Sequence, residues 1–184
     1  PTPLLRSSIL NQKVTANIYF KFEGAQKIGA FKARGAINTL LHLKEQNKLP
    51  REVVAYSSGN HAQAVAWAAK TLGIKSTIIV PASASPIKIA ATKSYGAEVI
   101  ITKERQEAED LAHQKSETCF LLPPYDNDDV IAGQGTASLE AWEKEGNFDA
   151  VFAPCGGGGL ISGTYLATRL FSDNAKIFAS EPLI

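Results

Sequence analysis

Short apolar segments alternate with longer amphipathic segments along the whole chain, and this alternation constrains the fold more than any other feature. The expected strands begin 21 to 35 residues apart, which leaves room for a helix between neighbours. Parallel pairing through crossover helices is therefore favoured over hairpins, and the pattern predicts an α/β fold of mostly parallel twisted sheets with flanking helices. The expected strands are residues 18–22, 53–57, 76–80, 98–102, 119–122, 150–153 and 176–179.

Helix signals occupy the intervals between these strands. Gly73 and Gly96 are stop signals, and Pro86 is a start signal. Two Pro-bearing polar segments, 49–51 and 123–128, are the best hinge candidates. The expected helices are residues 63–72, 87–95, 105–115, 130–145 and 160–171, with a further helix that opens within 29–36 and runs to about 43.

Composition is that of a soluble globular protein, with 45% hydrophobic and 20% charged residues and a net charge of +1. This balance predicts no nucleic-acid partner, and no apolar run approaches the roughly 20 residues of a membrane span. Cys119 and Cys155 lie in apolar surroundings, which predicts buried, reduced thiols and a cytoplasmic location. The chain has no methionine, and we expect it to be a processed or trimmed piece of a longer protein.

Four consecutive glycines, Gly156, Gly157, Gly158 and Gly159, lie between an expected strand and an expected helix. Glycine is costly in regular structure, so the run indicates that a ligand approaches the backbone closely, and free N–H groups at a helix N-terminus favour a phosphate. A tight turn or a flexible linker is the plainer alternative. A dinucleotide site also stays open, because the GxGxxG pattern is missed by one position and an acidic residue closes the next expected strand.

A second polar cluster, Ser57, Ser58, Gly59, Asn60 and His61, also joins a strand to a helix. Two hydroxyls and an amide in a small volume suit a carboxylate or a polar ring substituent. Simple N-capping would need only one of these residues. For His61 alone, a histidine satisfied within the helix start is an equally good interpretation.

Lys32 stands near the start of the expected helix that opens within 29–36. A lysine on a helix is usually solvated, but an ammonium close to the positive end of a helix dipole has a lowered pKa. A lowered pKa favours the neutral amine that reacts with an aldehyde. The three loops together offer an amine, a carboxylate site and a phosphate site.

The chain resembles the fold-type II pyridoxal-phosphate enzymes, specifically the threonine dehydratase and serine racemase group. The resemblance extends in order over essentially the whole chain. Its matching stretches are residues 2–5, 21–23 with Gln26, 29–36, 57–61, 91–92 with 95–99, 123–126, 130–136, 156–159 and 180–182.

The resemblance implies a role for each loop. Lys32 would hold pyridoxal 5′-phosphate as a Schiff base and move protons at the substrate α-carbon, with Phe31 packed at the cofactor ring. Asn60 would bind the ring hydroxyl, and Gly156 to Gly159 would hold the phosphate. Ser57 to His61 would bind the substrate carboxylate, with Ser58 as the second acid/base of the racemases. Glu181 would bind a divalent cation, Mg²⁺ or Ca²⁺.

The sequence departs from the family pattern before the lysine, where Ile28 and Ala30 replace two hydroxyl residues. The family's chains are also longer. By resemblance, residues 53–129 form a small domain, and residues 1–52 and 130–184 form part of a large cofactor-binding domain.

These features predict an enzyme, a cytoplasmic ammonia-lyase that converts L-threonine or L-serine to a 2-oxo acid and ammonia. A serine or aspartate racemase is the closest alternative, and a dinucleotide-binding module is a further one. The expected partner is a small amino-acid substrate, with no membrane and no nucleic acid, and the resemblance alone implies a homo-oligomer.

Overall fold

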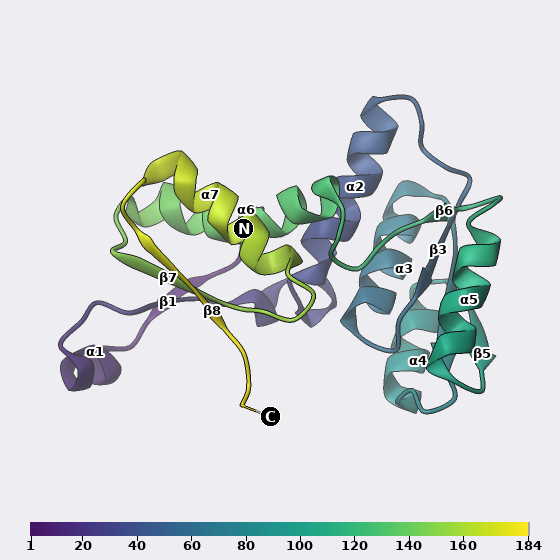
Figure 1. The fold of residues 1–184 in the computed structure, drawn as a ribbon, viewed down its shortest axis with the longest axis horizontal. Coiled ribbons are helices and arrows are strands. Elements are labelled where there is room, and N and C mark those ends of the chain that lie inside the picture. The colour runs from purple at the N-terminus through teal and green to yellow at the C-terminus, as the bar shows by residue number, and fades with distance from the viewer. Residues whose placement is uncertain (184) are drawn as a thin grey trace.

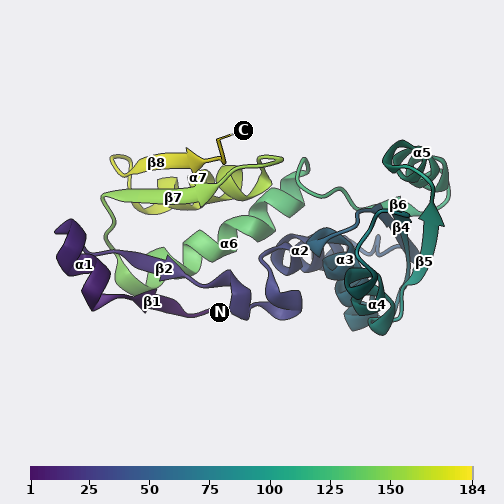
Figure 2. The same cartoon turned by 90° about the horizontal axis from the view of Figure 1, so that it is seen from below.

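The computed structural model describes residues 1–183 as two lobes that lie side by side along the long axis of the molecule (Figure 1). One lobe contains β3 to β6 with α3, α4 and α5, and the other contains β1, β2, β7 and β8 with α1, α6 and α7. Helix α2 lies between them, as the turned view also shows (Figure 2). The strands are β1 (Leu4–Arg6), β2 (Tyr19–Lys21), β3 (Glu52–Tyr56), β4 (Lys75–Pro81), β5 (Glu98–Thr102), β6 (Phe120–Leu121), β7 (Ala150–Pro154) and β8 (Lys176–Ser180). The α-helices are α1 (Ser8–Val14), α2 (Lys32–Glu45), α3 (Asn60–Leu72), α4 (Pro86–Ser94), α5 (Arg105–Lys115), α6 (Asp128–Glu145) and α7 (Gly159–Phe171).

The first lobe is built on a parallel four-stranded sheet in the order β5-β4-β3-β6. Its central strand β3 is buried on both faces. Val53 and Ala55 join the apolar cluster that includes α3, while Val54, which points to the opposite face, packs with Ala108 and Ala112 of α5. Because side chains alternate between the faces of a strand, a continuous apolar run is what a sheet covered by helices on both sides requires. The predicted α/β class is therefore confirmed.

The second lobe contains two separate pairs of strands. Strands β7 and β8 are parallel neighbours, with α7 as their crossover. Strand β2 pairs antiparallel with β1, so the expectation of parallel pairing was wrong for the segment 18–22. Strand β1, which has three residues, and helix α1, which has seven and buries none of them, were not predicted from the sequence.

Glycines allow the three central helices to cross closely. A Cβ on Gly133 of α6 would lie 2.7 Å from the backbone of α2 at Gly35, and a Cβ on Gly135 would lie 2.7 Å from the carbonyl oxygen of Gly163 on α7. These glycines are therefore required by helix packing. The crossing joins the helix that begins at Lys32 to the helix that follows the glycine run.

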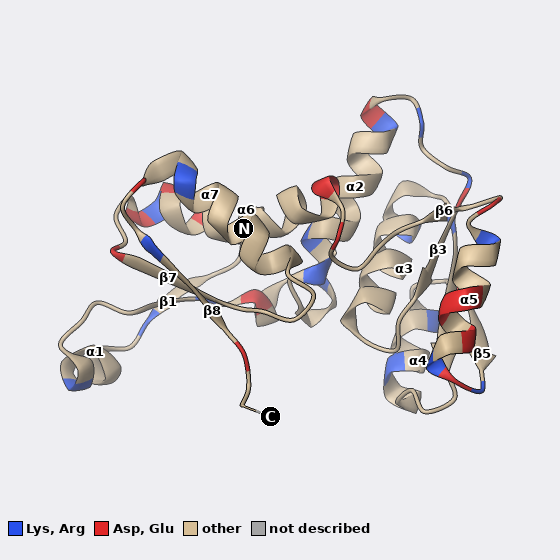
Figure 3. Ribbon diagram, in the orientation of Figure 1, with Lys and Arg blue, Asp and Glu red and all other residues tan. Residues whose placement is uncertain are grey.

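Three further observations concern the surface. The thiols Cys119 and Cys155 are free but only half-buried, so the expectation of fully buried cysteines was wrong. Positively and negatively charged residues are scattered over both lobes (Figure 3). Within residues 1–183, no helix combines the length and apolar character that crossing a bilayer requires. The domain boundaries predicted above stay a prediction.

Candidate active site

Residues 122–125, here called the strap, run from the end of β6 towards α6 and contact all three loops that the sequence singled out. The Leu122 carbonyl accepts a hydrogen bond from His61, and the Pro124 carbonyl accepts one from Lys32. The Tyr125 ring lies against Gly157. The strap thus brings together segments that are far apart in the sequence, since Lys32 and Pro124 stand 92 positions apart. The sequence marked this segment as a hinge candidate and missed its place in the site.

Lys32 is the first residue of α2, and its side chain is half-buried. Its ammonium group lies 5.3 Å from the centroid of the Phe31 ring and 5.8 Å from that of the Tyr125 ring. Burial lowers the pKa of the Lys32 amine from its ordinary value. The direction agrees with the prediction from the sequence, but the predicted cause was the helix dipole, whereas loss of hydration is the cause found in the structure.

The backbone before Lys32 is unusual. Ile28 has φ 61° and Gly29 has φ 70°, and a left-handed conformation is costly for a β-branched residue such as isoleucine. The Ile28 side chain packs against the apolar core of the first lobe, and Ala30 is buried. Apolar packing of Ile28 and Ala30 therefore holds this loop in place, whereas the family pattern has hydroxyl residues at these two positions.

His61 is buried at the start of α3, and its Nε2–H donates a 2.9 Å hydrogen bond to the Leu122 carbonyl. Since a carbonyl can only accept, this contact fixes the Nε2–H tautomer. Burial lowers the pKa of the imidazole to about 4, and the nearby Lys32 ammonium acts in the same direction, although the hydrogen bond to Leu122 opposes both. His61 therefore stays neutral at pH 7 and ties α3 to the strap.

Stability should consequently fall in mild acid because of His61. The unfolded histidine takes up a proton near pH 6.5, but the folded one does so only near pH 4. The stabilising contribution is complete above pH 6.5 and is lost as the pH falls to about 4, by up to about 3 kcal/mol. Urea unfolding between pH 7 and 4.5 should show this loss in the wild type and in His113→Gln, an exposed control, and should show less of it in His61→Gln. Parallel pH profiles for the wild type and His61→Gln would contradict the assignment.

The other residues of the Ser57 to His61 loop are more accessible. The Ser57 hydroxyl accepts a 3.2 Å hydrogen bond from the Gly59 N–H, while Ser58 and Asn60 are exposed. A Cβ on Gly59 would lie 4.0 Å from the ammonium nitrogen of Lys88, so a cation from α4 stands beside the loop. Lys88 was not among the site residues predicted from the sequence. Its charge suits a loop that binds a carboxylate.

The glycine run leaves β7 and starts α7 at Gly159. Gly158 has φ 86°, a conformation that favours glycine. The N–H groups of Gly156 and Gly157 make no hydrogen bond to residues 1–183. These free donors, next to the positive end of α7, can bind a phosphate.

Glu181 follows β8 and is exposed. Partial desolvation and the neighbouring Glu181 carboxylate together raise the pKa of the Cys155 thiol. Among residues 1–183, no cluster of three or more His, Cys, Asp or Glu side chains is placed to hold a metal ion. Any cation bound at Glu181 would therefore need additional ligands.

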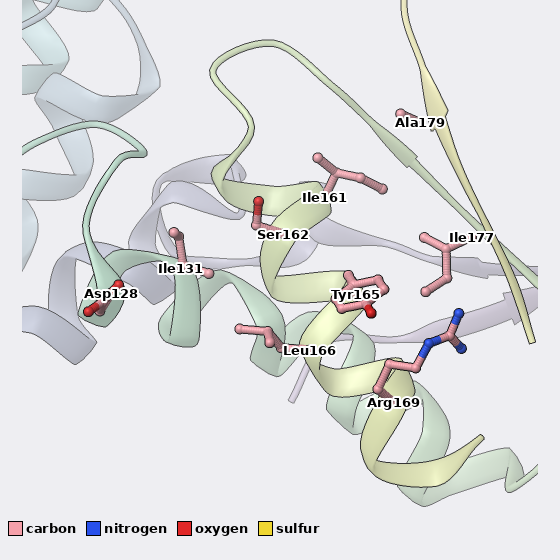
Figure 4. Close-up of a pocket in the computed structure, with 9 residues that line it drawn as sticks. All are labelled: Asp128, Ile131, Ile161, Ser162, Tyr165, Leu166, Arg169, Ile177 and Ala179. Carbon is pink, nitrogen blue, oxygen red and sulfur yellow. The ribbon is translucent and has the colours of Figure 1, made fainter. Parts of the chain in front are cut away.

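A separate, open and mostly apolar pocket of about 630 Å³ is lined by α7, β8 and the start of α6. Figure 4 shows Ile177 and Ala179 of β8 on one side and Tyr165, Leu166 and Arg169 of α7 on the other. None of the predicted site residues lines this cavity. The candidate site is therefore the region around the strap.

Comparison with known proteins adds independent information. A family model described as "Pyridoxal-phosphate dependent enzyme" matches residues 1–183. The L-threo-3-hydroxyaspartate ammonia-lyase of Saccharomyces cerevisiae is 48% identical over 98% of this chain, which covers 56% of that protein. The catabolic L-threonine dehydratase of Staphylococcus aureus is 44% identical over 98% of the chain, which covers 53% of that protein.

The crystal structure of serine racemase from Dictyostelium discoideum superposes with a TM-score of 0.92 at 44% identity, over 99% of this chain and 60% of that one. The chain thus spans little more than half the length of these relatives. The family match favours pyridoxal phosphate over a dinucleotide for the glycine loop. The chain belongs to the family of pyridoxal-phosphate-dependent enzymes.

Proposed function

We propose that the protein is an ammonia-lyase that uses pyridoxal phosphate to convert a β-hydroxy amino acid to a 2-oxo acid and ammonia, by elimination of water followed by hydrolysis. L-threonine and L-serine are the substrates inferred from the sequence, and 3-hydroxyaspartate is the third candidate because Lys88 adds a cation beside the carboxylate loop. The observation that carries the proposal is the contact of one strap with Lys32, with His61 and with the glycine run.

The residues present fit the cofactor. Free N–H groups and a left-handed glycine at the start of α7 suit its phosphate, and a partly dehydrated lysine suits its aldehyde. We assign Gly156 to Gly159 to the phosphate, Phe31 and Asn60 to the ring, and Lys32 to the covalent bond. Reduction with sodium borohydride should leave a phosphopyridoxyl group on the peptide that contains Lys32, and mass spectrometry of the digest tests this.

In this proposal the cofactor supplies an electron sink for the charge that develops when the α-proton leaves. The amine of Lys32, whose pKa is lowered by burial, accepts that proton as a general base. The N–H and hydroxyl groups of Ser57 to Asn60 bind and orient the substrate carboxylate. Loss of the β-hydroxyl as water gives an aminoacrylate, and the imine tautomer of this product reacts with water to give the 2-oxo acid and ammonia.

Racemisation is the second candidate function, because Ser58 is exposed on the substrate loop and has no partner among the hydrogen bonds of residues 1–183. A serine that only positions the carboxylate contributes ground-state binding, whereas one that returns a proton contributes to the chemical step. For a pure lyase, Ser58→Ala should therefore raise KM more than it lowers kcat. For a racemase, the same change should abolish interconversion of L- and D-serine and spare much of the elimination. Parallel kinetics of both reactions decide between them, and equal loss of both would remove any special role for Ser58.

The remaining assignments rest on the resemblance. We propose a cytoplasmic homo-oligomer in which residues 53–129 form the small domain and residues 1–52 and 130–184 belong to the large one. We also propose that Glu181 binds a divalent cation. The cation would need further ligands, because residues 1–183 contain no cluster of His, Cys, Asp or Glu side chains placed to hold a metal ion.

A further inference from the structure

The Tyr125 side chain is packed into the glycine run more closely than any residue other than glycine would permit. A Cβ built on Gly157 would lie 2.2, 2.4 and 2.5 Å from three atoms of the Tyr125 ring. A Cβ on Gly159 would lie 2.9 Å from the Tyr125 carbonyl oxygen and 3.0 Å from its Cα. Two of the four glycines therefore accommodate Tyr125.

The other two glycines differ. Gly158 has a left-handed backbone with open space around its Cα, and Gly156 has no atom within 4 Å of a built Cβ. Gly157 itself lies outside the left-handed region, so alanine there would suffer from contact with the ring and not from its backbone conformation. Contact with Tyr125 thus requires glycine at 157 and 159, and the backbone conformation favours it at 158, whereas neither contact nor backbone requires it at 156.

The strap contacts Lys32 as well as the glycine run. The Pro124 carbonyl accepts a hydrogen bond from Lys32, and the ring of the next residue, Tyr125, lies 5.8 Å from the Lys32 ammonium while it covers Gly157. Two successive residues therefore link the amine with the loop assigned to the phosphate. A shift of Tyr125 would alter the distance between the Lys32 amine and the glycine run. In the proposed function these two groups bind opposite ends of one cofactor.

We infer that Tyr125 is a positioning residue that fixes the conformation of the phosphate-binding glycine run, and that Gly157 is glycine because of Tyr125 and not because of the phosphate. This inference rests on the proposed function, since it assigns the phosphate to that run. The ring acts through packing, so phenylalanine can replace tyrosine, and alanine cannot.

A double-mutant cycle measured by cofactor binding tests this inference in the intact protein. Dissociation constants are determined for pyridoxal phosphate and for pyridoxal, which lacks the phosphate, in the wild type, Tyr125→Phe, Tyr125→Ala, Gly157→Ala and the double variant. Overpacking in a filled space costs a few kilocalories per mole, so Gly157→Ala alone should weaken pyridoxal phosphate binding by about tenfold to a hundredfold. In the Tyr125→Ala background the same change should cost less than about twofold, because its steric partner is gone.

The comparison with pyridoxal separates positioning of the phosphate loop from general damage. Tyr125→Ala should weaken binding of pyridoxal phosphate and leave that of pyridoxal nearly unchanged, whereas Tyr125→Phe should bind both like the wild type. Tyr165→Ala, which removes a half-exposed tyrosine of α7 far along the helix from the glycine run, is the matched control and should bind both normally.

An equal penalty for Gly157→Ala in both backgrounds, or equal weakening of both ligands by Tyr125→Ala, would overturn the inference while leaving the proposed function intact. A wild-type protein that binds neither ligand would overturn the proposed function together with the inference.

Discussion

Lys32→Ala should abolish covalent attachment of pyridoxal phosphate and lower 2-oxo acid production by at least about 10³-fold, because the variant loses the amine to which we assign both the bond to the aldehyde and the role of general base. The fold should survive. Lys32 is the first residue of α2, where alanine is a good helix former, and its ammonium contacts the strap and not the core. Absorption of the bound cofactor, borohydride trapping and product assay together measure the loss.

Lys27→Ala is the matched control, since Lys27 is exposed and lies only a few residues before Lys32. It should keep both the trapped adduct and the activity. If Lys32→Ala forms product at the wild-type rate, or if the adduct appears on another lysine, Lys32 is not the catalytic residue.

Arg34→Met should destabilise the protein by about 3 to 5 kcal/mol, because Arg34 is a nearly buried cation held between two carboxylates. Its guanidinium donates to Glu23 at 2.7 and 2.8 Å and to Glu140 at 2.6 and 2.9 Å, and to the hydroxyls of Thr2 and Thr136 at 3.0 Å. Burial alone would raise the pKa of Glu140, but hydrogen bonds from Arg34 and Lys21 lower it to about 2. Removing Arg34 would leave two carboxylates without their shared partner.

Thermal unfolding measures the effect, which should be a fall in Tm of roughly 6 to 20 °C for a chain of this size. Arg34→Lys should recover only part of the loss, since an ammonium cannot make two bidentate contacts. Arg51→Met, at an exposed position, is the control and should change stability by less than about 0.5 kcal/mol. A Tm for Arg34→Met close to that of Arg51→Met would show that the cluster contributes little.

The cluster around Arg34 explains several of the stretches on which the family resemblance was based. Thr2 comes from one of these stretches and Lys21 and Glu23 from another, yet all three contact Arg34 or its partner Glu140. Likewise, Gly133 and Gly135 serve the crossing of α2, α6 and α7. These residues stabilise the framework that carries the site, which the sequence alone could not distinguish from a direct role in binding.

Secondary structure was predictable wherever the local signals were strong. The expected helix 105–115 agrees with α5 at both ends, and the strand 98–102 agrees with β5. Helix α3 was expected to start at residue 63 but starts three residues earlier, at Asn60. Its N-cap residue is Gly59, which has no side chain to form a capping hydrogen bond that would mark the boundary. Strand β1 was missed because it has only three residues, all exposed or half-buried. Helix α1 was missed because it is short and buries no residue, so neither element shows apolar periodicity.

The sequence by itself determined the α/β class, the family and the three loops with chemically suitable groups, because each depends on residues adjacent in the chain. Only the tertiary structure decided how those loops meet. The strap joins Lys32, His61 and Gly157 through backbone carbonyls and one ring, and such contacts leave no local pattern in the sequence. The lowered pKa of Lys32 likewise depends on burial by distant segments, which periodicity and motif spacing do not reveal.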